Sequence, residues 1–586
     1  MKILQSLLRR EAESQRLNYL RVFSLAYFRA RALLRPTGQR RIVDHVLLFA
    51  IFSLIFCLAA SPQEAKPGSV NRNRSERIEW FRDAGFGLFI HWSFDSQLGS
   101  TISHSLVGAS EAYLQRFINE LPGSFNPKRF DPHDWAVLAR LAGMKYVVFT
   151  TKHHSGFCMF RTASTPFSVI NTPFGRDATA EIVTAFREQG IAIGFYYSPD
   201  DFYWLHREGK QLDRHRPEVE PANNPELLKY DQSQIRELLT NYGPIDVLFF
   251  DGPSEGLKEL AWDLQPNLVI TRGVMETPEQ YIPGVPLDRP WEACLTMGTS
   301  WQYKPTNEVY KSGTELIRLL IETRAKGGNL LLNVGPKPNG ELPVEQEDRL
   351  REIALWNFVN RESVEEVRPW VVTNENDVWF TRRKNEDTVY AFAAIQPPWK
   401  LGEWKTFTLR SVEATVNSVV SVLGQNDKVL EYRPEVIPQT KWRQTEKGLE
   451  ITAMRAQRLY DDRKWPNPVV LKMTHVKPAM EPPQVITSHA TWDRAAQVAI
   501  LQGELKNLGK AESVELGFQY RRKKGLTDLY EKTEPWTDSG LVKRNGTGSY
   551  STRVSGLTPG EAYEFRALVK HPLITIYGES SSFEAK

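Results

Sequence analysis

Two adjacent histidines close one of the most apolar stretches of the chain. The run YVVFTT at 146–151 is followed at once by Lys152, His153 and His154. A single histidine at a strand end is often structural, and an aspartate before glycine is often a turn or a cap. Here, however, several apolar runs end on residues of this kind, which indicates one shared functional site. The other strand-end residues are His91, Trp92, Tyr196, Tyr197, Asp251 and Arg272.

Two kinds of chemistry could use these side chains. Histidines and an aspartate could bind a metal ion, but binuclear hydrolase barrels usually present His-x-His, and adjacent residues of an extended strand point in opposite directions. Imidazole, tyrosine and tryptophan side chains can instead bind the hydroxyls and apolar faces of a sugar, which leaves a pair of carboxyl groups for acid and nucleophile work. The composition of the set favours the sugar site, so we expect neither a metal ion nor a cofactor.

The segments that carry these residues alternate between short apolar runs and helical patterns from about residue 77 to 358. Such alternation, with nearly continuous apolar strands, is typical of a parallel sheet covered by helices on both faces. A length of about 280 residues suits an α/β fold of the (β/α)8-like TIM barrel type, in which the carboxyl ends of the strands form the active-site mouth. G-x-G-x-x-G does not follow the first strand, which disfavours a dinucleotide fold. We therefore predict a catalytic barrel over 70–363.

The pattern changes near residue 364 to strands without intervening helices, which predicts a β-sandwich over 364–478. The Pro-rich stretch KPAMEPPQ then opens a third unit, predicted over 483–586. We expect both β units to be accessory, either shielding the barrel or contacting glycans. The third unit resembles a fibronectin type III domain through an L-x-P-x-x-x-Y-x-F-R-A pattern at Leu557, Pro559, Tyr563, Phe565, Arg566 and Ala567.

The amino-terminal segment differs from the rest of the chain in charge and hydropathy. Its first 45 residues hold 10 Lys and Arg against 3 acidic residues, although the whole chain has a net charge of only +4. The remainder is slightly acidic, so no basic surface for nucleic acid is implied. The apolar run at 46–60 is shorter than the roughly 20 residues of a spanning helix, and small polar residues follow it. We predict a basic leader with a signal peptide over 1–66 and a secreted or periplasmic protein, with no membrane partner unless this segment is an uncleaved anchor.

Six motifs of the predicted barrel resemble one enzyme family when they are taken in order. They are FIHW at 89–92, TTKHHSGF at 150–157, GFYYS at 194–198, VLFFDG at 247–252, TPE at 277–279 and GGNLLLNVGPKPNGELP at 327–343. Over the whole barrel the chain resembles the α-L-fucosidases, family 29 of the glycoside hydrolases, and the sandwich fits the second domain of that family. The resemblance implies an exo-enzyme that removes terminal α-L-fucose from an oligosaccharide or glycoconjugate, and the amino-terminal segment predicts that this enzyme is secreted.

The family resemblance also implies a retaining mechanism, with two carboxyl groups about 5–5.5 Å apart and a covalent glycosyl-enzyme intermediate. Asp251, which follows four apolar residues, is the expected nucleophile. The loop after Arg272 holds three glutamates, of which Glu279 in TPE is the favoured acid/base, Glu292 is next and Glu276 is third. The expected substrate-binding residues are His91, His153, His154, Tyr196 and Arg272 for the polar ring, and Trp92, Phe249 and Trp301 for the apolar walls.

Three short segments depart from the family pattern. Ser93 stands where the family often has glycine, ITRG at 270–273 replaces Asn-Asp-Arg-Trp, and SWQY at 300–303 replaces SWGY. These changes leave every candidate carboxyl group in place but alter the fine shape of the pocket. Two alternatives therefore stay open: a related retaining glycosidase with a different sugar preference, and a non-catalytic carbohydrate-binding barrel protein, which would be expected to lose a carboxylate.

Overall fold

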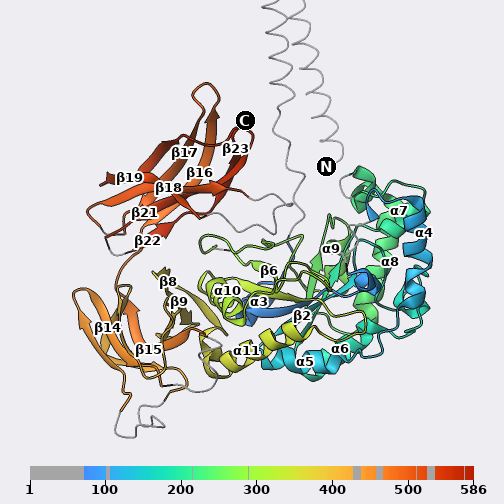
Figure 1. Ribbon diagram of the computed structural model, residues 1–586, viewed down its shortest axis with the longest axis horizontal. Coiled ribbons are helices and arrows are strands. Elements are labelled where there is room, and N and C mark those ends of the chain that lie inside the picture. The colour runs from blue at the N-terminus through green and yellow to red at the C-terminus, as the bar shows by residue number, and fades with distance from the viewer. Residues whose placement is uncertain are drawn as a thin grey trace, which may run out of the picture. The chain divides into compact units, whose positions relative to one another are not determined.

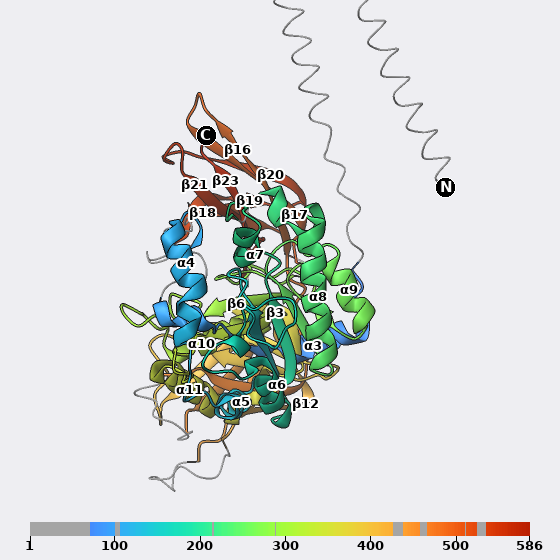
Figure 2. The ribbon, with the colours of Figure 1, turned by 90° about the vertical axis from the view of Figure 1, so that its right-hand side faces the viewer.

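The computed structural model describes residues 71–99, 106–213, 216–287, 289–425, 437–456, 466–509, 511–523, 535–572 and 574–586. The predicted leader with its signal peptide or anchor, residues 1–66, lies outside the described residues. Among the helices that are described, none has the length and apolar character needed to cross a membrane. Figures 1 and 2 show the ribbon from two directions.

A parallel sheet of seven described strands carries the strand-end residues. Its order is β5-β4-β3-β2-β1-β7-β6, and every neighbouring pair is parallel. The carboxyl ends of all seven strands therefore lie at one edge, which confirms the prediction of a TIM-like parallel sheet. The strands are β1 (Phe86–Ile90), β2 (Tyr146–Lys152), β3 (Ala192–Tyr197), β4 (Val247–Phe250), β5 (Val269–Ile270), β6 (Glu292–Thr296) and β7 (Asn329–Val334).

Helices follow the strands and pack beside one another around the sheet (Figure 1). Asp131, Asp177 and Asn224 each begin a helix by accepting a backbone N–H of its first turn. Such a cap satisfies a donor that the helix cannot pair internally, so these residues define where the helices start. The helices are α3 (Ser75–Ala84), α4 (Glu111–Asn119), α5 (Pro132–Leu141), α6 (Ala178–Glu188), α7 (Phe202–Arg207), α8 (Pro225–Asn241), α9 (Leu257–Leu264), α10 (Gly313–Ala325) and α11 (Val344–Asn360).

Two apolar cores lie on the two faces of this sheet. Leu88 of β1 packs into the layer shared with the helices, whereas its neighbour Phe89 packs on the inner face. This division follows from strand geometry, because successive side chains point to opposite faces. On the inner face the ring of Phe89 lies 5.9 Å from that of Tyr196 and 5.2 Å from that of Phe249, measured between centroids. Aromatic rings therefore fill the space beneath the strand ends.

Short segments cover both edge strands of the sheet. The side-chain amide of Asn73 bonds to both backbone groups of Ile270 in β5: its nitrogen donates to the carbonyl and its oxygen accepts from the N–H, each at 2.9 Å. At the other edge, residues 276–280 run beside β6, and the Cys294 N–H donates to the Pro278 carbonyl at 3.0 Å. These bonds satisfy edge groups that a further strand would otherwise pair.

Residues 367–586 contain antiparallel strands, as expected from the change of pattern near residue 364. Sheets β12-β15-β10-β9-β8 and β11-β14-β13 share one apolar core, and sheets β16-β17-β20 and β19-β18-β21-β22, with β23 beside β21, share another. The boundaries predicted for the three units, 70–363, 364–478 and 483–586, remain predictions. The strands are β8 (Val367–Glu375), β9 (Val378–Arg383), β10 (Val389–Ala393), β11 (Trp404–Leu409), β12 (Val412–Val422), β13 (Lys441–Thr445), β14 (Gly448–Met454), β15 (Val469–Pro478), β16 (Gln484–Asp493), β17 (Val498–Asn507), β18 (Val514–Arg522), β19 (Thr537–Arg544), β20 (Gly548–Val554), β21 (Ala562–Lys570), β22 (Thr575–Tyr577) and β23 (Ser581–Glu584).

Candidate active site

Asp251 stands where a buried strand reaches the surface. Strand β4 is fully buried, whereas the side chain of Asp251, the next residue, is 21% exposed. The backbone N–H of Asp251 donates to the Tyr197 carbonyl at the end of β3, at 3.0 Å, which keeps the residue in line with its strand. Gly252 then turns the chain with a φ of 148°, at a place where a side chain would meet Pro199 and Asp200. Local structure thus holds a carboxylate at the carboxyl edge of the sheet.

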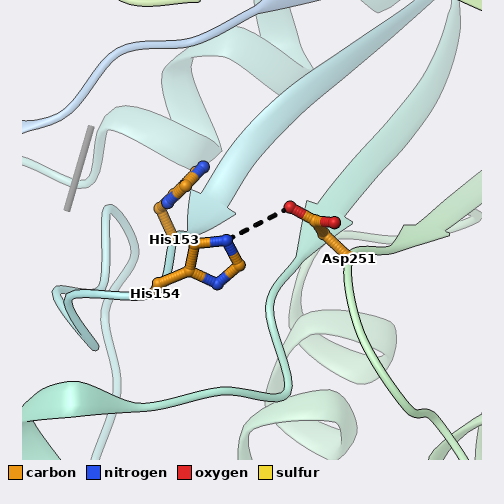
Figure 3. Close-up of side chains that lie close together, drawn as sticks. All are labelled: His153, His154 and Asp251. Atoms are coloured by element: carbon orange, nitrogen blue, oxygen red, sulfur yellow. Dashed lines mark ion pairs between the residues drawn. The ribbon is translucent and has the colours of Figure 1, made fainter. Parts of the chain in front are cut away.

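Two side chains donate hydrogen bonds to the Asp251 carboxylate, and a third lies beside it. Tyr196 donates its hydroxyl hydrogen to Oδ2 at 2.6 Å, and Arg272 donates from Nη1 to Oδ1 at 3.1 Å. Nε2 of His154 lies 3.3 Å from Oδ2, the contact drawn in Figure 3. A guanidinium and a hydroxyl donor favour the ionised form of a carboxylate. Asp251 is therefore suited to act as a nucleophile.

Arg272 joins Asp251 to a second carboxylate. Its Nη2 donates to Glu279 Oε2 at 2.9 Å, and its Nε donates to Thr277 Oγ1 at 3.2 Å. The guanidinium carbon lies 4.6 Å from the ring centroid of Phe249, a cation–π contact that fixes the plane of the group. Because Arg272 follows β5 and Glu279 belongs to the segment beside β6, one cation links the two edges of the sheet.

Asn333 holds His91 in one orientation. The amide nitrogen of Asn333 donates to the Trp301 carbonyl at 2.6 Å, so its amide oxygen faces Nδ1 of His91, also at 2.6 Å. Nδ1 therefore carries the hydrogen, and Nε2 is left as an acceptor. Burial lowers the pKa of His91 to about 3, which keeps the ring neutral above that pH. A neutral imidazole with a free acceptor suits a sugar hydroxyl.

Other expected binding residues gather around the same point. The His153 ring stacks on Tyr196 with centroids 5.1 Å apart, and lies 5.8 Å from the ring of His91. Trp301 lies 4.9 Å from His91, and Phe249 stacks on Tyr196 at 5.6 Å. The structure thus brings polar rings and apolar rings to one mouth, which can contact both the hydroxyls and the apolar face of a sugar.

Trp92 points away from this group. It is fully buried, stacks on Phe130 with centroids 4.9 Å apart and meets Trp135 of α5 edge-on at 5.5 Å. It therefore lies in the core outside the sheet rather than in the mouth. The reason is again the alternation of an extended backbone: because His91 faces the mouth, the next residue faces the helices.

Two of the three candidate glutamates lie elsewhere. Glu292 is the first residue of β6, fully buried, and the hydroxyl of Tyr146, the first residue of β2, donates to its carboxylate. Glu279 lies beside Cys294, so Glu292, two residues earlier on β6, lies below the mouth in the interior of the sheet. Burial raises the pKa of Glu292 to about 7. Glu276 pairs with Arg289 at 3.4 Å on the surface.

Replacing Glu292 by glutamine is expected to stabilise the protein at neutral and alkaline pH. The folded protein keeps a proton on Glu292 up to about pH 7, whereas the unfolded chain releases it near pH 4.5. The wild type therefore loses stability as the pH rises from about 4.5 to 7, on the order of 3 kcal/mol, and the variant does not. Melting temperatures between pH 4.5 and 8 test this, with Glu276→Gln as the surface control. A difference that stays constant with pH would contradict the expectation.

A buried ion cluster lies directly behind the histidines. Nζ of Lys152, which has no exposed surface, is 3.1 Å from Asp201 and 2.9 Å from Asp231, and the Tyr197 hydroxyl donates to Asp231 at 2.6 Å. Because Asp201 begins α7 and Asp231 lies in α8, the cluster ties β2 to both helices. Sequence reasoning missed it, although a lysine that ends a buried strand signals a buried acidic partner.

Replacing Lys152 by methionine is expected to lower the free energy of unfolding by about 3–5 kcal/mol, because two buried carboxylates would lose their cation. Lys477→Met is the matched control: Lys477 pairs with Glu413 at the surface, and the loss of that pair should lower the free energy of unfolding by less than about 1 kcal/mol. Denaturant unfolding followed by tryptophan fluorescence measures both. Equal losses in the two variants would show that the buried cluster contributes no more than a surface pair.

Among the residues that the structure describes, His153, His154 and Asp251 form a group that could hold a metal ion. Their ligand atoms all lie within 4.8 Å of one another (Figure 3). Arg272 already brings a positive charge to within 3.1 Å of Asp251, which opposes a second cation there. Nδ1 of His154 is in turn engaged with Ser198 Oγ at 2.5 Å. The donor set therefore fits a neutral polar ligand better than a metal ion.

Comparisons with known proteins agree with this geometry. The sequence model of the family described as Alpha-L-fucosidase matches residues 54–362. Plasma alpha-L-fucosidase of Pongo abelii is 30% identical over 406 residues, which cover 61% of this chain and 85% of that protein. The structure of alpha-L-fucosidase isoenzyme 1 from Paenibacillus thiaminolyticus is similar with a TM-score of 0.53 and 28% identity, covering 68% of this chain and 98% of that chain. A second similar structure is a GH29 alpha-L-fucosidase from Bacteroides thetaiotaomicron, solved as a trapped covalent intermediate in complex with 2-fluoro-fucosyl fluoride. Its TM-score is 0.55 and its identity 22%, and the match covers 70% of this chain and 99% of that chain.

Proposed function

The chain belongs to the α-L-fucosidase family of glycoside hydrolases, family 29, and we propose that it removes terminal α-L-fucose from oligosaccharides or glycoconjugates with retention of configuration. One observation carries the proposal: Arg272 hydrogen-bonds to both Asp251 and Glu279. A retaining glycosidase needs two carboxyl groups on either side of the scissile bond. A shared cation holds Asp251 and Glu279 at one mouth, whereas Glu292 is buried below that mouth in the interior of the sheet.

In the first step Asp251 acts as the nucleophile. Its carboxylate oxygen forms a bond to C1 of the fucose as the bond from C1 to the glycosidic oxygen breaks. Glu279, as general acid, gives its proton to that oxygen, so the remainder of the glycan leaves as a neutral alcohol. The fucosyl ester of Asp251 is the intermediate.

In the second step a water molecule attacks C1 and gives a proton to Glu279, which now acts as a base. The ester bond breaks and Asp251 regains its negative charge. The donors from Tyr196 and Arg272 stabilise that charge as it returns, because both already point at the carboxylate oxygens. Two inversions at C1 return the fucose in the α configuration.

The surrounding rings supply specificity for fucose. We assign the sugar hydroxyls to His91, His153 and His154, of which His91 presents an acceptor fixed by its bond to Asn333. Trp301 and Phe249 supply the apolar walls for the methyl group and the ring face, as aromatic side chains do in sugar sites. The methyl group of fucose distinguishes it from a hydroxymethyl sugar, which would place a polar group against these rings.

The test is hydrolysis of 4-nitrophenyl α-L-fucoside by the purified full chain, with nuclear magnetic resonance used to identify the first anomer of fucose released. We expect α-L-fucose to appear first and the β anomer to follow by mutarotation. Aryl α-D-mannoside and β-D-galactoside are the controls for sugar preference. Activity on one of these instead would favour a retaining glycosidase of different specificity, and binding of fucose without hydrolysis would favour a non-catalytic carbohydrate-binding protein.

We also propose that the protein is exported and that its carboxyl-terminal unit is a fibronectin type III-like accessory domain. Export is supported by the basic leader and the apolar run at 46–60. Amino-terminal sequencing of the mature protein tests export.

The domain assignment is supported by two packed antiparallel sheets and by Tyr563 near the start of β21, whose hydroxyl accepts the Thr558 N–H at 2.9 Å. Such a tyrosine corner is typical of immunoglobulin-like sandwiches.

A further inference from the structure

We propose that Asp200 is a positioning residue for the reaction, one that fixes the Nδ1–H tautomer of His154, so that Nε2 faces the mouth beside Asp251 as an acceptor for a hydroxyl of the bound sugar. The inference rests on the proposed function, because it assigns Asp251 as the nucleophile. Asp200 is a buried residue of the loop after β3, and it is not one of the catalytic or binding residues predicted from the sequence. Three sets of contacts support it.

The first set fixes the hydrogen on His154. Nδ1 of His154 lies 2.5 Å from Ser198 Oγ and 3.4 Å from Asp200 Oδ2. The Ser198 hydroxyl donates its own hydrogen to the Asp200 carbonyl at 3.1 Å, so its oxygen is free to accept. Both neighbours of Nδ1 are therefore acceptors, and Nδ1 must carry a hydrogen. The partner of one ring nitrogen thereby determines what the other nitrogen presents.

The second set connects this ring to the nucleophile. Nε2, at the far side of the same imidazole, lies 3.3 Å from Asp251 Oδ2. His154 is 1% exposed and Asp200 is 2% exposed, so water screens their interaction little. A Cβ on Gly252 would lie 3.4 Å from Asp200 Oδ1, which means that Asp200 also lies against the backbone next to Asp251. Asp200 is thus in contact with both segments that form the floor of the mouth.

The third set shows that Asp200 does not serve as a helix cap. That role belongs to Asp201, whose Oδ1 accepts from the Trp204 N–H at 2.8 Å at the start of α7, while its Oδ2 pairs with Lys152. The Phe202 N–H also donates to the His154 carbonyl at 2.8 Å. Asp200 is therefore held between rigid neighbours, and its own side chain is directed to His154. A group held in this way can orient a binding residue within the tolerance that catalysis requires.

Two substitutions test the inference. Asp200→Ala should lower kcat/KM for 4-nitrophenyl α-L-fucoside by about 10-fold to 100-fold, the usual cost of losing an orienting partner. Asp200→Asn should lose less, because its amide oxygen can still accept the Nδ1 hydrogen. Asp213→Asn is the control, since this aspartate of the segment after α7 pairs with Arg216 at 3.4 Å and should keep wild-type activity. Melting temperatures confirm that each variant folds.

A spectroscopic readout separates positioning from a general structural effect. The chain has 11 histidines, so nitrogen-15 labelling of histidine gives a spectrum in which His154 is identified by the signal lost in His154→Gln. We expect the Nδ1–H form of His154 in the wild type and a changed tautomer signal in Asp200→Ala. Activity within twofold of wild type, or an unchanged His154 signal in a folded Asp200→Ala, would overturn the inference. A wild type that fails to hydrolyse aryl fucosides would instead overturn the proposed function, and the His154 signal would still decide the contact with Asp200.

Discussion

Replacing Asp251 by glycine is expected to lower kcat for 4-nitrophenyl α-L-fucoside by roughly 10³-fold to 10⁶-fold, and added azide is expected to restore turnover. The variant lacks the oxygen that forms the ester to C1, and the loss of a nucleophile costs about this much in other covalent enzymes. Azide fits the space that the carboxylate leaves and can attack C1 directly. The product would be β-L-fucosyl azide, because a single displacement inverts the configuration.

The matched control is Asp263→Ala. Asp263 is an exposed aspartate of α9 whose carboxylate pairs with Arg72 at 2.9 Å, so its loss should leave hydrolysis unchanged. Product analysis by mass spectrometry and nuclear magnetic resonance identifies the fucosyl azide and its anomer. Hydrolysis by Asp251→Gly at the wild-type rate would remove Asp251 from the mechanism.

Glu279→Gln is expected to reduce hydrolysis of an alkyl α-L-fucoside by about 10²-fold to 10⁴-fold, whereas Glu292→Gln should keep near wild-type activity. An alkoxide needs a proton as it leaves, and the amide of glutamine cannot supply one. A nitrophenolate leaves without that help, so the first step should suffer less with the aryl substrate. Azide should again restore turnover, but here with formation of α-L-fucosyl azide, since Asp251 is still present to form the ester.

Glu276→Gln completes the comparison of the three glutamates. Its carboxylate pairs with Arg289 at the surface, so we expect the rate of hydrolysis to stay unchanged with both the alkyl and the aryl substrate. Parallel kinetics of the three variants with the alkyl and aryl substrates decide the assignment. A selective loss in Glu292→Gln with a melting temperature like that of the wild type would transfer the acid/base role to the buried glutamate.

Much of the fold follows from local patterns. Apolar runs that end on polar residues predict buried parallel strands, and the structure confirms the TIM-like sheet with those residues at its carboxyl edge. The place of Asp251 at the mouth was predictable because this residue directly follows the buried strand β4. Adjacent residues of an extended strand face opposite sides, so the sequence could also have predicted that His91 and Trp92, which follow β1, do not both face the mouth.

The rest of the site depends on contacts that no local pattern encodes. Glu279 and Glu292 lie in one segment of the sequence, so the sequence does not show which of them is accessible to a substrate. That difference arises only when residues 276–280 fold beside β6 and the start of β6 is buried. Asp231 is 79 positions from Lys152, in a helix whose place depends on the whole barrel. Long-range pairing therefore decides which of several plausible charges are buried.

The amide of Asn73 has a consequence for protein modification. The sequence Asn73-Arg74-Ser75 matches the acceptor pattern for N-linked glycans, as does Asn545-Gly546-Thr547 in the exposed turn before β20. A sugar attached to the Asn73 nitrogen would remove its bond to the Ile270 carbonyl and place a bulky group at the edge of β5. In a host that glycosylates secreted proteins during synthesis, Asn545 can carry a glycan without harm, whereas occupancy of Asn73 would compete with closure of the sheet that positions Arg272. The choice of expression host would thus affect the yield of active protein.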